Sequence, residues 1–239
     1  MKIGINLNKN IRMKRFFLVF AVALLTCATV SAQVPNFAGT AGKDNIYGYF
    51  SFKARPGINN QETYSTIQYG ATDWMALGAD YYTGLDQRYL GITARFGKLS
   101  FCKNFNVGAQ FTPSFDLQDN FKWSYLTSAL YINGDISSDG KLFYVADTWY
   151  TVNKGDAENT IDQWLYLAYS FQFKNGHGIT PMIGSIYSWK FDKDPDLALG
   201  AYYSIGKCNL YLWGNDFFKK NPRVVLGLEF KFDVGSKKH

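Results

Sequence analysis

A repeated alternation of apolar with polar or small side chains limits the fold of this chain more than any other feature. Between positions 105 and 116, Phe, Val, Ala, Phe, Pro and Phe alternate with Asn, Gly, Gln, Thr, Ser and Asp. Between positions 224 and 232, Val, Leu, Leu, Phe and Phe occupy every second position. Successive side chains of a β-strand point to opposite faces, so each stretch predicts a strand with one apolar face.

Runs of this kind, divided by turn residues, fill the chain from residue 46 almost to its end, and there are about twelve of them. Helical periodicity is absent outside the first 32 residues. The predicted strands are 46–55, 63–71, 74–82, 89–96, 105–116, 121–133, 142–152, 161–173, 179–190, 197–205, 208–215 and 224–232. The sequence therefore predicts an all-β fold of consecutive antiparallel hairpins.

Two kinds of protein contain strands with one apolar face. In a soluble sheet that face packs on a protein core, whereas in a membrane barrel it meets lipid and the polar face lines the interior. The strand number is even, and many runs are near the 9–11 residues that a tilted transmembrane strand needs. Connections also alternate between tight turns, such as 72–73, and longer charged loops, such as 191–196 and 216–222. These features favour a single antiparallel up-and-down transmembrane β-barrel of about 12 strands.

Residues 1–32 have the layout of a secretory signal peptide. Lys14 and Arg15 precede the apolar run 16–25, and the small residues at 30–32 offer a cleavage site. The apolar run is too short for a permanent membrane anchor, which needs about 20 residues. The predicted segments are a signal peptide at 1–32, a periplasmic lead-in at 33–44, the barrel at 45–232 and a polar tail at 233–239.

The predicted signal peptide also explains the formal net charge of +6. Once its five basic residues are removed, 20 basic residues face 19 acidic ones. The remainder carries no basic stripe of the kind that binds nucleic acid, so we expect no nucleic-acid partner.

Met13 offers an alternative start of translation within the predicted signal peptide. The sequence leaves open whether Cys27 is lipidated.

Motifs for catalysis and metal binding are missing from the sequence. The two histidines are His177, in a predicted turn, and His239, in the tail. Hydrolases and acyltransferases commonly rely on a histidine as the base or as its partner. The aspartates of 192–196 lack the Gly and Glu that complete a calcium loop. We therefore expect no enzymatic activity, no metal site and no cofactor.

The predicted inner face combines aromatic rings with charges of both signs. A barrel of about 12 strands is intermediate between small barrels filled by their own side chains and wide porins, so a narrow lumen is expected. The candidate lumen-lining residues are Tyr47, Tyr49, Lys53, Arg55, Asp80, Tyr82, Arg95, Gln110, Asp147, Trp149, Asp162, Tyr166, Tyr211, Trp213, Glu229 and Lys231.

Two cysteines, Cys102 and Cys208, remain after the leader, and both fall at predicted turns. In the predicted strand order these turns lie about half a barrel circumference apart, whereas a disulfide needs Cα atoms within about 7 Å. The sequence therefore predicts two free thiols.

The whole predicted barrel resembles the Gram-negative outer-membrane β-barrel proteins in its pattern. The stretch 224–232, with an aromatic residue near the C-terminus, resembles their closing strand. A narrow lumen lined by rings and ionisable groups also loosely resembles the nucleoside-specific outer-membrane channels. The resemblance implies a monomer in the bacterial outer membrane, with outer-membrane lipids, lipopolysaccharide, the barrel-assembly machinery and small-molecule solutes as partners.

Two functions are compatible with this resemblance. The first is a narrow channel for small polar or aromatic solutes. The second is a non-conducting structural or adhesive barrel that displays its external loops.

Overall fold

The computed structural model describes residues 37–55, 60–84, 86–102, 104–189, 191–192, 194–219 and 221–235, without the side chains of 60 and 98–102. The predicted signal peptide lies outside these residues. The strands are β1 (Asn45–Arg55), β2 (Asn60–Gly70), β3 (Met75–Thr83), β4 (Arg88–Cys102), β5 (Phe105–Asp116), β6 (Lys122–Asp135), β7 (Leu142–Asn153), β8 (Thr160–Tyr169), β9 (Phe171–Gln172), β10 (His177–Trp189), β11 (Asp196–Ile205), β12 (Cys208–Asn215) and β13 (Arg223–Asp233). In the described part of the chain, no helix is both long and apolar enough to cross a bilayer.

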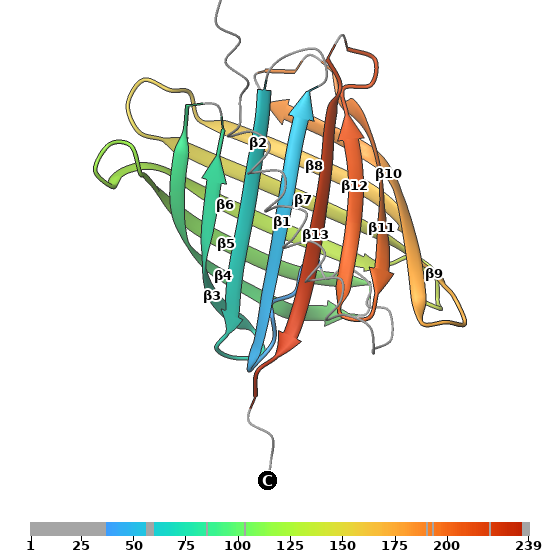
Figure 1. The fold of residues 1–239 in the computed structure, drawn as a ribbon. Helices are drawn as coiled ribbons and strands as arrows, with labels where there is room; N and C mark the ends of the chain where they lie inside the picture. The colour runs from blue at the N-terminus through green and yellow to red at the C-terminus, as the bar shows by residue number, and fades with distance from the viewer. Residues whose placement is uncertain are drawn as a thin grey trace, which may run out of the picture.

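The strands form one closed antiparallel barrel (Figure 1). Each strand pairs with the next along the chain, except that β8 pairs with β10, and β13 pairs with β1 to close the ring. The short β9 follows β8 after Ser170 and pairs with β10 beside it, so the 13 strands form a 12-strand barrel with one extra strand. The predicted all-β, up-and-down architecture is confirmed.

Both described ends of the chain lie at one end of the barrel. Asn45, at the start of β1, pairs with Asp233, at the end of β13. We call this end the terminal mouth and the opposite end, where β1 stops at Arg55, the far rim. The terminal mouth is at the bottom of Figure 1.

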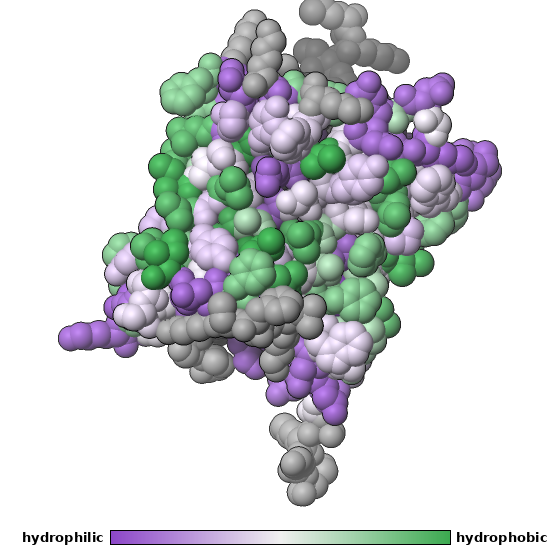
Figure 2. Space-filling model, turned by 180° about the vertical axis from the view of Figure 1, so that it is seen from behind, coloured by the Kyte–Doolittle hydropathy of each residue, from purple (hydrophilic) through white to green (hydrophobic). Residues whose placement is uncertain are grey.

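The outer wall of the barrel is apolar. Large side chains such as Ile92, Ile183 and Leu77 are at least half exposed and point away from the interior. Figure 2 shows apolar side chains across the wall and polar side chains gathered toward both ends. Exposed apolar patches of this extent are rare on soluble domains, whereas a lipid-facing wall requires them.

Strand β4 is longer than the alternation predicts. The predicted strand ends at 96 and leaves 98–104 as a connection, but β4 continues to Cys102 and pairs with β5 as far as Phe105. The pairing has irregularities between Phe96 and Leu99 and between Ser100 and Cys102. A bulge inserts an extra residue and shifts the side-chain period, which is why the alternation fails here. The prediction of a long connection at 98–104 is therefore wrong.

The prediction of free thiols is also wrong for Cys208, which is disulfide-bonded. The side chains of Cys27 and Cys102 lie outside the described residues.

One half of the barrel interior is filled by its own apolar side chains. The cluster comes from β7, β8, β10 and β11, with Phe37 and Trp213 packed against it. Its buried members are Phe143, Val145, Tyr166, Ala168, Met182, Ile186 and Ala198. Among the described residues, the large cavity lies beside this cluster, lined by polar and aromatic side chains of the other strands and by Asp147, Trp149, Trp164 and Tyr202 of β7, β8 and β11.

Candidate solute site in the barrel interior

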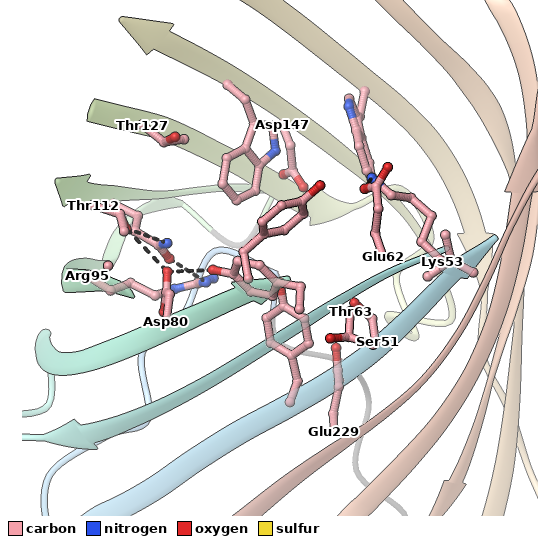
Figure 3. A pocket seen from close by; sticks show the side chains of 18 of the residues that line it. Ser51, Lys53, Glu62, Thr63, Asp80, Arg95, Thr112, Thr127, Asp147 and Glu229 are labelled. Carbon is pink, nitrogen blue, oxygen red and sulfur yellow. Dashed lines mark hydrogen bonds and ion pairs between the residues drawn. The ribbon is translucent and has the colours of Figure 1, made fainter. Parts of the chain in front are cut away.

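A cavity of about 430 Å³ occupies the polar side of the interior. It runs from Phe37, near the terminal mouth, to Lys53, Glu62 and Tyr89, which lie within two residues of strand ends at the far rim. A volume of this size is within the range of small-molecule sites. Figure 3 shows polar side chains from several strands converging on this space.

Most of the sequence-predicted lumen residues meet at this cavity. Arg55 and Asp162 instead belong to a network at the far rim, Tyr166 lies in the apolar cluster, and Lys231 lines a second, small cavity beside the terminal mouth. The predicted residues that line the large cavity are Tyr47, Tyr49, Lys53, Asp80, Tyr82, Arg95, Gln110, Asp147, Trp149, Tyr211, Trp213 and Glu229.

Several cavity residues were not predicted from the sequence. Tyr125 and Tyr131 lie on β6, whose two faces both carry apolar or aromatic side chains, so the alternation did not show which face is internal. The pairing of Tyr131 with Gly108 would have assigned Tyr131 to the inner face, because the two faces of β5 are clearly distinguished by its alternation. Phe37 precedes the first strand, and nothing in its local sequence indicates that the chain turns back into the barrel.

Residues 37–42, which we call the N-terminal plug, cross the interior near the terminal mouth. The Arg95 guanidinium donates from Nε to the Gly39 carbonyl at 2.7 Å and from Nη2 to the Phe37 carbonyl at 2.5 Å. The Thr40 hydroxyl donates to the Asp73 carbonyl at 3.0 Å. Ala38 and Ala41 are each only 2% exposed, so the plug is an integral part of the barrel interior.

The barrel wall is shaped to receive this plug. A Cβ at Gly97 would lie 2.6 Å from the Ala38 carbonyl oxygen, and a Cβ at Gly108 would clash with the same atom. Only glycine allows the plug backbone to approach the wall so closely. Across the interior, the Phe37 ring lies 5.7 Å from Tyr202 and 6.3 Å from Phe143, measured between ring centroids. The plug therefore spans from β4 and β5 to β7 and β11.

The wall opposite the apolar cluster contains a satisfied carboxylate. Asp80 accepts hydrogen bonds from the Tyr64 and Thr66 hydroxyls, both at 2.5 Å, and lies 3.5 Å from the Thr112 hydroxyl. Asp80 is 4% exposed, and a buried carboxylate requires partners of this kind. Its hydrogen-bonding capacity is largely used within the wall.

A second carboxylate, Asp147 on β7, has a different environment. Its Oδ1 atom is buried and has no hydrogen-bond partner, and the same holds for Nε1 of Trp149. Both side chains line the cavity, and Figure 3 shows Asp147 directed into it. An acceptor atom and a donor atom without partners thus belong to residues of the cavity lining, two residues apart on one strand.

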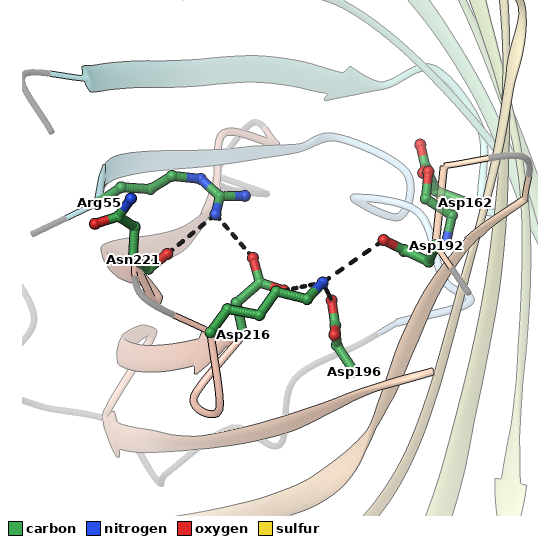
Figure 4. A network of polar contacts seen from close by, with 8 residues as sticks. Arg55, Asp162, Asp192, Asp196, Asp216 and Asn221 are labelled. Atoms are coloured by element: carbon green, nitrogen blue, oxygen red, sulfur yellow. Dashed lines mark hydrogen bonds and ion pairs between the residues drawn. The ribbon is translucent and has the colours of Figure 1, made fainter. Parts of the chain in front are cut away.

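A network of charges ties the loops together at the far rim (Figure 4). Asp216 accepts from Arg55 at 2.8 Å and from Lys219 at 3.2 Å, and Lys219 also donates to Asp196 at 2.9 Å. Burial of the Asp216 carboxyl raises its pKa, but its hydrogen bonds with Asp196, Arg55 and Lys219 outweigh this and bring the pKa to about 2. The loop after β12 is therefore joined to β1 and β11 by a carboxylate that stays ionised.

The network extends to the neighbouring loop. Ser188 donates from its amide to Asp192 at 2.7 Å and from its hydroxyl to Asp162. Lys219 lies 3.7 Å from Asp192, which connects this pair to the rest. In the described part of the chain, no group of three or more His, Cys, Asp or Glu residues is arranged to hold a metal ion.

Comparisons with known proteins show the fold. No protein-family model matches the chain, and no curated protein matches it by sequence. Among solved structures, the KdgM porin matches with a TM-score of 0.55 at 9% identity, over 78% of this chain and 99% of that one. The NanC porin matches with a TM-score of 0.55 at 10% identity, over 77% of this chain and all of that one. A structure of the KdgM porin in complex with disordered oligogalacturonate has a TM-score of 0.54 at 9% identity, over 78% of this chain and 99% of that one.

At this level of identity the likeness concerns the fold alone. The closed barrel, the apolar outer wall and the shared porin fold together place the chain in the bacterial outer membrane. The predicted resemblance to outer-membrane β-barrel proteins is confirmed.

Proposed function

We propose that this protein is a narrow outer-membrane channel for small polar or aromatic solutes, closed at its periplasmic mouth by the N-terminal plug. The observation that carries the proposal is the cavity of about 430 Å³, which reaches from the plug to the far rim. Rings and charges of both signs line it, including Tyr49, Tyr82, Lys53 and Glu62. Such a lining offers stacking surfaces and hydrogen bonds without favouring one sign of ion.

Passage of a solute requires the plug to move. The cavity ends at Phe37, and Arg95 holds the plug by two hydrogen bonds to backbone carbonyls. A short terminal segment with these anchors has two states, seated and displaced, and a small population of the displaced state gives a small conductance. We further expect a monomer that contacts outer-membrane lipids and lipopolysaccharide and is inserted by the barrel-assembly machinery.

The second candidate is a non-conducting structural or adhesive barrel. One observation favours it: the apolar cluster and the plug fill much of the interior. Tyr211 lies 5.3 Å from Tyr202, and Trp213 lies 5.1 Å from Trp164, so these rings pack against their neighbours.

Conductance of purified protein in a planar bilayer separates the two candidates. A channel gives a small, weakly ion-selective conductance that an aromatic solute such as a nucleoside partly blocks, and Trp213→Ala weakens the block without preventing folding. A filled barrel gives no steady conductance in the wild type or after loss of the plug, and its Trp213→Ala variant is less stable but no leakier. The second result would refute the channel.

A further inference from the structure

The unsatisfied polar atoms of β7 point to a solute class for this cavity. We propose that Asp147, Trp149 and the rings beside them bind a small organic cation that carries a hydrogen-bond acceptor, such as a short amino alcohol with an alkylated ammonium group. The inference rests on the proposed function only in naming a solute for the same cavity. Binding itself does not require that the barrel conducts.

Asp147 supplies a carboxyl oxygen that the surrounding protein leaves without a hydrogen-bond partner. Oδ1 is buried without a hydrogen-bond partner, and no salt bridge joins Asp147 to a cationic side chain among the described residues. The nearby guanidinium of Arg95 directs its donors to Phe37, Gly39 and Gln110. A buried carboxylate oxygen without a partner is costly, and a cation in the cavity would remove that cost.

Aromatic rings surround this carboxylate. Asp147 pairs across the sheet with Tyr131 on β6 and with Trp164 on β8, and Trp149 follows it on the same face of β7. Directly paired residues have Cβ atoms about 4.5–5.5 Å apart, so these rings lie close to the carboxylate. Electron-rich ring faces attract quaternary ammonium groups, which lack N–H donors and gain little from ordinary hydrogen bonds.

The structure itself shows that this part of the wall accommodates a cation. The Arg95 guanidinium carbon lies 4.2 Å from the centroid of the Tyr131 ring. The Trp149 ring stands nearly perpendicular to that of Tyr131, at 88° and 5.5 Å between centroids. The Arg95 guanidinium therefore occupies the Tyr131 ring, whereas the Trp149 and Trp164 rings line the cavity.

Trp149 adds a requirement on the rest of the solute. Its Nε1–H can only donate a hydrogen bond, and it has no acceptor in the protein. An ammonium group offers no hydrogen-bond acceptor, so a second group of the solute, such as a hydroxyl, must accept the hydrogen bond from Trp149 Nε1–H. Asp147 and Trp149 are two residues apart on one strand, about 7 Å along the backbone, which suits a short linker between the two groups.

Isothermal titration calorimetry, in which choline is added to the purified, folded full-length barrel, tests the proposal. Choline should bind, and its uncharged analogue 3,3-dimethylbutan-1-ol should bind at least tenfold more weakly. Asp147→Asn should weaken choline binding at least tenfold and leave the alcohol unaffected. Asp139→Asn, which removes a half-exposed carboxylate in the turn before β7, is the control and should bind choline like the wild type.

A second variant tests the donor. Trp149→Phe keeps a ring and removes the N–H, so the preference for choline over tetramethylammonium should disappear. Absence of choline binding by the wild type, equal binding of choline and the alcohol, or unchanged binding by Asp147→Asn would each overturn the inference. Conductance is measured separately, so a barrel that binds choline but does not conduct refutes the channel and leaves this site standing.

Discussion

Arg95→Ala is expected to release the N-terminal plug from the barrel interior. The variant removes two charged hydrogen bonds to the plug, of 2.7 Å and 2.5 Å. A hydrogen bond to a charged group contributes about 1.5–3 kcal/mol net, so the pair contributes about 3–6 kcal/mol to the seated state. At about 1.4 kcal/mol per factor of ten, the displaced population should rise by roughly 10²–10⁴.

Hydrogen–deuterium exchange of a peptide covering residues 37–44 measures this population directly. The Gly42 amide donates to the Thr40 hydroxyl at 3.2 Å, and the Asp44 amide donates to the Gly70 carbonyl at 2.9 Å. Displacement of the plug brings the Gly42 amide and its local hydrogen bond out of the barrel interior into water, so exchange of this amide should accelerate by at least about 100-fold, whereas the Asp44 amide lies beyond the plug and serves as the internal reference. Conductance should rise in parallel if the plug limits it.

Three further variants separate the plug from general damage. Gly108→Leu attacks the same contact from the wall, because its side chain would occupy the position of the Ala38 carbonyl, and it should also accelerate exchange. Arg95→Lys keeps the charge but loses the two-pronged geometry and should be intermediate. Arg55→Ala removes a guanidinium from the far rim and should leave exchange of the plug unchanged. Unchanged exchange in folded Arg95→Ala and Gly108→Leu barrels would refute the reasoning.

Two other predictions concern the wall and the far rim. Leu130→Arg places a charge on the lipid-facing side of β6, where Leu130 is 43% exposed, and should cost about 2–4 kcal/mol of stability, seen as less heat-modifiable folded barrel. Thr127→Arg on the cavity side of the same strand is the control and should fold nearly normally; equal loss in both would contradict the membrane orientation. The second prediction concerns the dependence of stability on pH. The pKa of Asp216 is about 2 in the folded protein and about 3.9 in an unfolded chain. The stability that ionised Asp216 contributes is therefore complete above about pH 5 and is lost as the pH falls toward 2. Asp216→Asn should therefore flatten the fall of the urea midpoint between pH 5 and 2.5, and an equal slope in both proteins would count against this role.

The sequence alone was sufficient for the architecture and for the facing of most side chains. The alternation in 105–116 predicts β5 with its limits, Phe105–Asp116, because the two-residue period of a strand is a local property of the backbone. The same period placed Asp80, Arg95 and Asp147 on the inner face, where they line the cavity. Where the period is interrupted, as by the irregular pairing after Phe96, the local signal no longer marks the end of the strand.

Only the tertiary structure decided which inner side chains meet. Alternation says that a residue points inward, but its neighbours across the barrel depend on the register of every pairing around the closed ring. That register brings Asp147 between Tyr131 and Trp164, and it sends Tyr166 into an apolar cluster instead of the cavity. The contact of Phe37 with β7 and β11 depends on the chain turning back through the mouth before β1, for which no periodic pattern exists. Local chemistry therefore determined the wall, while the closure of the ring determined the site inside it.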